Sequence, residues 1–396
     1  MMYKIKLDER PVGYAVAPAK SGDRAAVEYR GLTVQSEGRE FIRKVKSLDA
    51  ILSKLPTAFQ PHTIKTFVAT INNDLEAKIY INESDVLAKI SVSRVGEIEK
   101  GDPVRLNDIL HVQEVSFEGI EFPKNCAYLV LLNHGWDRVF YYDFGPLLEN
   151  ENKREIDYSV TDFLSYGYSR ALFYETYDVS EDDWKKVTSS GWFPFAFTTY
   201  EQQKSLIQHI IYDWDHSHII EDINKDFRFG HQQWLDSIFT NTDSSLAKHK
   251  GRVEKALEFH NQGDYDTAVH LLYPRLESAL RDDFLMSNPD KKGQNQGSLS
   301  KHISQNVSNR SYSFSRYFPE QFSTFLTTTF FRNYDPHSDA NPASRNSVSH
   351  GAIDESAIGM KESLIGFLIF DQIHRYIEFN KSVVAELQKK TCNSDG

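Results

Sequence analysis

The sequence predicts an α+β multidomain protein, with a β-rich N-terminal domain, a mixed segment and a C-terminal all-α bundle of four or five helices. Its length of 396 residues allows two or three domains at about 100–200 residues each. Short β-branched or alternating runs fill the first third. In the last third, apolar residues recur at three- and four-residue steps. The expected boundaries are residues 1–145, 146–245 and 246–396.

The composition is typical of a folded intracellular protein. Hydrophobic residues make up 40% of the chain, and the net charge is −11 at neutral pH. That acidic balance argues against a protein that coats nucleic acid indiscriminately, but it leaves room for a local basic cleft. The longest apolar stretches hold about seven residues, whereas a membrane helix needs about 20. The N-terminus lacks the apolar core of a secretory signal, and Cys126 and Cys392 cannot build a disulfide framework. We therefore expect a cytoplasmic protein without membrane contact.

Short runs of β-branched and alternating apolar residues predict the strands of the first domain. Turn residues such as Asn, Asp and Gly separate the runs. The last two runs form a hairpin, with Asn133, His134 and Gly135 at its turn. The predicted strand segments are residues 63–71, 77–81, 87–95 and 108–117 and the hairpin 128–144.

The pattern changes after Pro146, where an acidic linker begins. Ser180, with Asp183 three residues later, is typical of a capping box and predicts a helix at Trp184. Residues 199–238 have the composition of helices. The middle segment is therefore expected to be mixed and mainly helical.

The last third carries the clearest helical pattern. Residues 266–284 are expected to form a helix with one apolar face, and Pro274 within this helix should kink it. A preceding helix is expected to end at Gly263. The members of the apolar face are Ala268, Leu271, Leu272, Leu276, Ala279 and Leu280. Further helices are predicted over residues 298–307, 320–331 and 355–387. By the usual connection rule, such a series forms an antiparallel bundle.

Three residues of complementary chemistry lie between the last two predicted helices: Arg345, Asn346 and His350. If this segment has entered the final helix, Asn346 and His350 share a face, and the long Arg345 side chain reaches the same point. Such a set suits cleavage of RNA without a metal ion. A histidine transfers protons near neutral pH, and an arginine brings fixed charge and several donors to phosphate oxygens. On residue types alone, a surface ion pair and a helix cap account for the same residues.

The run RNSVSHG, residues 345–351, resembles the RNxxxH motif of the HEPN superfamily of prokaryotic RNases and defence toxins. The run GDYDTAVHLLYPRLESALRD, residues 263–282, is similar to an upstream helix of the large-protein branch of that superfamily. The resemblance covers about residues 250–390 and none of the first 145. As a whole the chain resembles Apea-like HEPN defence proteins, whose N-terminal region is not catalytic. By analogy of architecture, the β-rich part is expected to sense a trigger or to regulate the nuclease.

The resemblance implies a metal-independent endoribonuclease toxin that needs no cofactor and acts in anti-phage defence or abortive infection by cleaving tRNA or mRNA. It implies a homodimer through the HEPN bundle, with the Arg-His pairs of two copies facing one cleft. Arg345 is then the phosphate ligand, Asn346 the polar position after it and His350 the acid or base. Products would carry 2′,3′-cyclic phosphate and 5′-hydroxyl ends. Ala352 stands where HEPN proteins paired with a nucleotidyltransferase carry a tyrosine, so modification of that tyrosine is not open to this chain.

Further residues are candidates for supporting roles. Glu277 and Arg281, four apart on the upstream helix, are expected either to support the site or to form an ordinary surface pair. Basic residues in a stretch without acidic side chains are expected either to guide RNA or to lie in a solvated loop. These basic residues are Lys291, Lys292, Lys301 and Arg310.

Other candidates have weaker support. Asp213, Asp215, His216 and His218 carry metal-ligand chemistry, but their spacing fits no familiar metal motif, so no metal is expected. His134 with Asp137 is most simply part of a hairpin turn. No P-loop, dinucleotide fingerprint, nucleophile elbow or kinase signature is present in the sequence.

Two alternatives to the nuclease remain open. One is a HEPN bundle that binds RNA or protein without cleaving, and the other is a non-enzymatic interaction protein. Constitutive cleavage of RNA would harm the cell that makes the protein. We therefore expect an inhibitory contact or partner, or a phage-derived trigger, to control the site.

Overall fold

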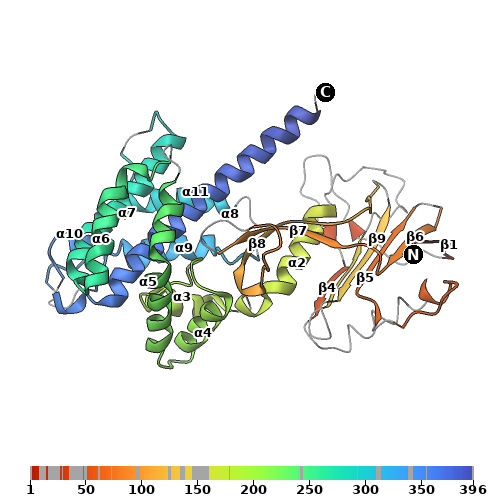
Figure 1. Cartoon of the computed structure of the whole chain (residues 1–396), viewed down its shortest axis with the longest axis horizontal. Helices are drawn as coiled ribbons and strands as arrows, with labels where there is room; N and C mark the ends of the chain where they lie inside the picture. The colour runs from red at the N-terminus through yellow and green to blue at the C-terminus, as the bar shows by residue number, and fades with distance from the viewer. Residues whose placement is uncertain are drawn as a thin grey trace. The chain divides into compact units, whose positions relative to one another are not determined.

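The computed structural model has an α+β architecture and divides into two compact units (Figure 1). The β unit comprises Met1–Ser91 and Val112–Tyr174, and the helical unit comprises Val92–His111 and Glu175–Gly396. These boundaries differ from the expected ones at residues 145 and 245. The structure describes residues 2–8, 15–16, 27–28, 30–34, 48, 51–60, 63–72, 74–93, 99–123, 126–133, 139–144, 160–177, 179–240, 244–291, 293–308, 314–337, 342–353 and 355–394.

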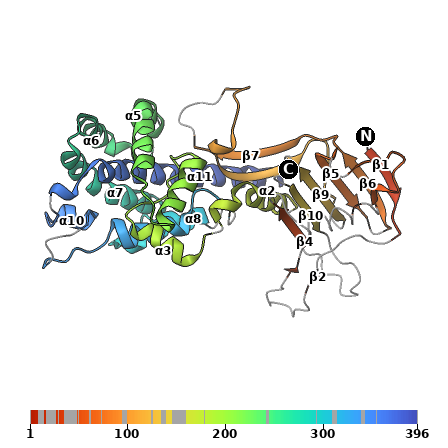
Figure 2. The ribbon, with the colours of Figure 1, turned by 90° about the horizontal axis from the view of Figure 1, so that it is seen from below.

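The β unit is built on a six-stranded antiparallel sheet with the strand order β1-β6-β5-β9-β10-β4 (Figure 2). Ala69 in the central strand β5 lies opposite Ile79 on one side and Leu129 on the other. The predicted strands and the pairing of the hairpin are confirmed, but residues 134–138 of its turn lie outside the described part. The strands are β1 (Met2–Lys6), β4 (Arg30–Val34), β5 (Thr66–Ile71), β6 (Glu76–Ile81), β9 (Ala127–Asn133) and β10 (Val139–Phe144).

The central strands β5 and β9 are buried along almost their whole length, and successive side chains of each strand lie on opposite faces of the sheet. Phe67, Ala69 and Ile71 of β5 lie in one apolar cluster with Leu48 and with residues of β6, β9 and the segment 51–55. Val68 of the same strand is also buried, so β5 has little contact with water on either face. The remaining elements with residues in this unit are β2 (Ala15–Val16), β3 (Val27–Glu28), β7 (Val86–Val92), β8 (Ile109–Phe117) and α2 (Val160–Tyr177).

Local signals determine where several helices of the helical unit begin and end. The Ser180 hydroxyl accepts from the Asp183 amide, and the helix begins at Glu181, three residues before the predicted start. Gly263 ends a helix in the left-handed conformation, at φ 84°, as predicted. The helices are η2 (Leu106–Asp108), α3 (Glu181–Ser189), α4 (Tyr200–Ile211), α5 (Ser217–Phe239), η3 (Ala247–His249), α6 (Lys250–Gln262), α7 (Tyr265–Ser287), α8 (Gln296–Ser308), α9 (Pro319–Phe325), η4 (Leu326–Phe330), α10 (Arg345–Ser349), η5 (Glu355–Ala357) and α11 (Met360–Ser394).

Helix α7 is the central element of the helical unit and lies against α6, α8, α10 and α11 (Figures 1 and 2). Its predicted apolar face is buried, except that Leu271 is only partly covered. The helix continues through Pro274, so the kink expected there stays a prediction. No helix in the described part of the chain is long and apolar enough to cross a membrane.

The segment Val92–His111 joins the helical unit although it precedes the helices by many residues. Arg316, fully buried, donates to the carbonyl oxygens of Asn107 and Ile109 at 2.8 and 2.9 Å. Arg375 of α11 donates to the carbonyls of Val92 and Ser93 at 3.3 and 2.9 Å. Leu110 contributes to the same apolar core as the helices. Two arginines from the C-terminal part of the chain therefore hold both ends of this segment.

Candidate functional site

The segment with the predicted catalytic residues forms the one-turn helix α10, separate from the final helix α11. Ser344 caps its start: the Ser344 hydroxyl accepts from the Ser347 amide at 3.1 Å, and the Ser347 hydroxyl accepts from the Ser344 amide at 2.9 Å. Gly351 adopts φ 62°, which turns the chain out of the helix. The condition under which Asn346 and His350 would share a face of the final helix is therefore not met.

Asn346 is buried and fixes α10 to its surroundings. Its Nδ2 donates to the Phe331 carbonyl at 2.9 Å, just after the π-helical turn η4. Its Oδ1 accepts from Gln296 Nε2 at 3.0 Å and from Arg345 Nη1 at 3.2 Å. Asn346 thus holds the Arg345 side chain from the neighbouring position in the sequence.

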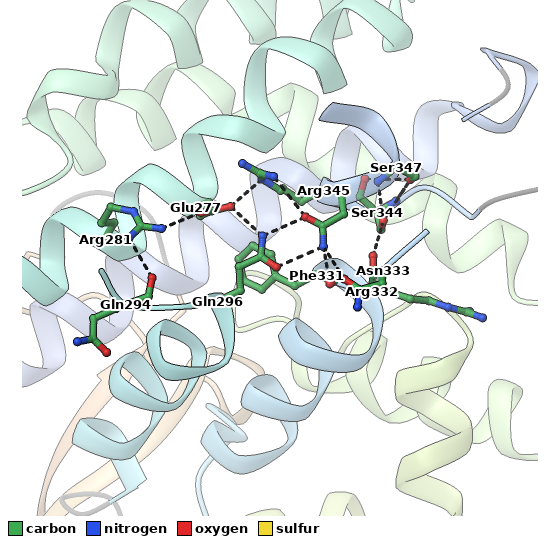
Figure 3. A network of polar contacts seen from close by, with 11 residues as sticks. Glu277, Arg281, Gln294, Gln296, Phe331, Arg332, Asn333, Ser344, Arg345 and Ser347 are labelled. Carbon is green, nitrogen blue, oxygen red and sulfur yellow. Dashed lines mark hydrogen bonds and ion pairs between the residues drawn. The ribbon is translucent and has the colours of Figure 1, made fainter. Parts of the chain in front are cut away.

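Glu277 of α7 is the second group that holds Arg345 (Figure 3). Arg345 Nε lies 2.7 Å from Glu277 Oε2, in an ion pair whose angle is not that of a hydrogen bond. Glu277 Oε1 accepts from Arg281 at 2.9 Å, and Oε2 accepts from Gln296 at 2.9 Å. Arg281 also donates to the Gln294 carbonyl at 3.0 Å. The two residues predicted to support the site therefore contact it, one directly and one through the other.

The electrostatics of this cluster leave a net positive charge. Burial by itself would raise the pKa of the Glu277 carboxyl. Hydrogen bonds from Gln296 and Arg281 and the charges of the two arginines outweigh burial, so the pKa of this carboxyl is lowered. One ionised carboxylate then faces two guanidinium groups. An anion such as a phosphate is the ligand that this balance favours.

His350 lies at the C-terminal end of α10 and is exposed. Its ring lies 5.2 Å from that of Tyr334, tilted by 34°. Among the described residues, no side chain or carbonyl makes a hydrogen bond to this imidazole. The structure therefore does not bring His350 into the cluster of Arg345, Asn346 and Glu277, and it leaves the ring open to a ligand.

Two of the four predicted RNA-binding residues lie in the described part. Lys291 is exposed, with its ammonium 5.9 Å from the centre of the Phe284 ring, and Lys301 is exposed on α8. Lys292 and Arg310 lie outside the described residues. Neither described lysine contacts the cluster around Arg345.

The weaker candidates are held by local contacts. Asp213 pairs with Lys186, and Asp215 accepts from the amide of Ser217 at 3.0 Å at the start of α5. No group of three His, Cys, Asp or Glu side chains suited to a metal ion occurs among the described residues. His134 and Asp137 lie outside them.

Sequence reasoning missed Gln296. It lies in a polar run at the start of α8, where no periodicity or motif distinguishes it from its neighbours. Only its placement between Glu277 and Asn346 reveals it. Comparisons of this chain with family models, curated proteins and solved structures found no match.

Proposed function

We propose that this chain is a metal-independent endoribonuclease of the HEPN type. The observation that carries the proposal is the placement of Arg345, the arginine of the RNSVSHG motif. Glu277 and Asn346 hold this arginine in a net-positive cluster, and the exposed His350 lies at the C-terminal end of the same short helix. Nη2 of Arg345 makes no hydrogen bond to any described residue. The side chain is 23% exposed, so this end can donate to a phosphate oxygen.

The reaction follows from the chemistry of RNA. A base removes the proton from the 2′-hydroxyl, the 2′-oxygen attacks phosphorus, and the bond from phosphorus to the 5′-oxygen breaks. That 5′-oxygen takes up a proton. The products are a 2′,3′-cyclic phosphate and a 5′-hydroxyl. His350 serves as the proton-transfer group, and Arg345 stabilises the charge that develops on the phosphoryl oxygens.

The remaining parts of the proposal rest on the resemblance. Two copies pair through the helical bundle, so that one imidazole acts as base and the other as acid. The protein works in the cytoplasm, and its targets are tRNA or mRNA during anti-phage defence. A phage-derived trigger or an inhibitory partner controls the site. Sedimentation of the purified chain tests the homodimer.

RNA cleavage in excess EDTA tests the proposal. Total cellular RNA is incubated with the full-length wild type, Arg345→Ala and His350→Ala, and the fragment ends are mapped. Each substitution should lower cleavage by about 100-fold or more, since each removes a group that acts on the reacting phosphate. Arg252→Ala on α6 and His218→Ala on α5, which replace exposed residues of the same types, are the matched controls. Lysate from phage-infected cells is added in a parallel series to supply a trigger.

The proposal fails if the wild type and both variants are equally inactive in every series, or if cleavage needs a divalent ion. RNA binding by gel shift then separates the two alternatives. Retained binding without turnover favours a HEPN module that binds RNA, and the absence of binding favours a protein-interaction role.

A further inference from the structure

Gln296 connects the two groups that hold Arg345. Its Nε2 donates to Glu277 Oε2 at 2.9 Å and to Asn346 Oδ1 at 3.0 Å. Its Oε1 accepts from Asn346 Nδ2 at 3.3 Å. The side chain extends from the first residue of α8 and is partly buried (Figure 3).

The partners determine which way this amide points. A carboxylate oxygen only accepts hydrogen bonds, so the Gln296 atom that faces Glu277 must be the nitrogen. The two hydrogens on that nitrogen match the two acceptors it contacts. No other natural side chain of this length brings an uncharged two-hydrogen donor to that point.

The same two acceptors contact Arg345. Glu277 Oε2 is the oxygen 2.7 Å from Arg345 Nε, and Asn346 Oδ1 is the oxygen 3.2 Å from Arg345 Nη1. Gln296 has no polar contact with Arg345 itself among the described residues. It therefore acts on the guanidinium only through the two oxygens.

We propose that Gln296 is a positioning residue for RNA cleavage, which fixes Glu277 and Asn346 so that Arg345 meets the reacting phosphate in one orientation. This inference rests on the nuclease function proposed above. A guanidinium with two fixed oxygens beside it loses its freedom to swing before RNA binds. Correct placement of such a group contributes mainly to the chemical step.

Two substitutions separate positioning from RNA binding. Gln296→Met keeps the length of the side chain and removes its hydrogen bonds. Gln296→Glu puts an oxygen opposite the Glu277 carboxylate, and protonation of the new carboxyl at lower pH restores one donor. We expect kcat to fall about 10- to 100-fold in both variants at neutral pH, with KM for RNA changed less than about threefold. Gln296→Glu should recover relative to Gln296→Met as the pH is lowered.

Gln305 provides matched controls, because it is the same residue type on the same helix with an exposed side chain. Gln305→Met and Gln305→Glu should keep wild-type kcat at each pH. Far-UV circular dichroism and thermal melting verify that each variant is folded. If Gln296→Met does not fold, the pH dependence of kcat for Gln296→Glu relative to that for Gln305→Glu decides the question.

The outcomes distinguish this inference from the proposed function. A wild type that cleaves RNA, with Gln296 variants as active as the Gln305 variants, overturns the inference and leaves the nuclease in place. A raised KM with unchanged kcat also overturns it, because Gln296 then contributes to RNA binding. A wild type without any cleavage overturns the nuclease and the positioning role together.

Discussion

His260 makes the stability of the helical unit sensitive to acid. The ring is fully buried, with Nε2 2.9 Å from Asn224 Oδ1 and Nδ1 2.8 Å from Ser363 Oγ. Because the amide oxygen only accepts, Nε2 carries the proton and Nδ1 accepts from the serine hydroxyl. These contacts join α6 to α5 and α11, so a change in the charge of this ring affects three helices.

Burial, reinforced by the charge of Arg228, lowers the pKa of His260 to about 4 from its ordinary value of 6.5. The unfolded chain therefore binds a proton below about pH 6.5, whereas the folded chain does so only near pH 4. The contribution of His260 to the free energy of unfolding is fully present above pH 6.5 and is lost as the pH falls toward 4. At about 1.4 kcal/mol per pH unit, the loss amounts to about 3 kcal/mol at pH 4.

The variant His260→Gln tests this because it keeps a donor and an acceptor but does not titrate. We measure the free energy of unfolding of wild type and variant by urea titration between pH 7 and 4. The difference between them should move by about 3 kcal/mol in favour of the variant. His337→Gln, which replaces an exposed histidine, should follow the wild type. Parallel pH curves for wild type and His260→Gln would refute the reasoning.

Three further predictions concern the packing of α11 against α7, the contacts of Arg316 and the cap of α10. In Gly366→Ala the new Cβ would lie 2.8 Å from Leu272 Cδ2 in the contact between α11 and α7, so we expect a loss of about 1–3 kcal/mol by urea titration. Gly230→Ala, whose new Cβ would have no atom within 4 Å, should instead raise the free energy of unfolding by up to about 1 kcal/mol. Equal effects of the two glycine substitutions would contradict the close packing at Gly366. Arg316→Met removes the donor of four hydrogen bonds, two of them buried and two half-buried, and should lower the free energy of unfolding by at least about 3 kcal/mol in the same assay. An unchanged urea midpoint would show that the contacts of Arg316 with residues 92–111 do not contribute to stability. Ser344→Ala removes the cap of α10 and should cost about 1 kcal/mol, read as roughly fivefold faster hydrogen exchange at the Ser347 amide; an unchanged exchange rate would refute it.

Features that depend on neighbouring residues could be predicted from the sequence. Ser180 marks a helix start because its side chain reaches an amide three residues on, and Gly263 marks a helix end because it tolerates a positive φ. The pairing of β9 with β10 is predicted for the same reason, because the two strands lie close together in the sequence.

The candidate site could be predicted only in part. Glu277 and Arg281 are four apart on one helix, so their ion pair follows from helical geometry. The pairing of Glu277 with Arg345 and the bridge through Gln296 depend on how α7, α8 and α10 pack, which no local pattern contains. The chain turns out of α10 at Gly351, which adopts a positive φ, and the presence of a glycine in the sequence does not by itself specify that conformation.

The burial and the contacts of Arg316 are the features that the sequence indicates least. An arginine in a short aromatic segment is expected at the surface, yet this one is fully buried and donates to oxygens of residues far away in the sequence. Buried polar acceptors need donors, and the need is created by the tertiary fold alone. The division of the chain at residues 92–111 was beyond prediction for this reason.

The hydrogen bonds from Arg316 and Arg375 to residues 92–111 also determine the order in which the helical unit assembles during synthesis. A chain emerges from the ribosome N-terminus first, so the carbonyl of Asn107 is made 209 residues before Arg316, its donor. The carbonyl of Val92 is made 283 residues before Arg375. The core of the helical unit is therefore completed only when α11 has been translated, after Arg345 and His350. A nascent chain that stops before α11 carries the motif without the fold that positions it, so the site is assembled only after α11 has been made.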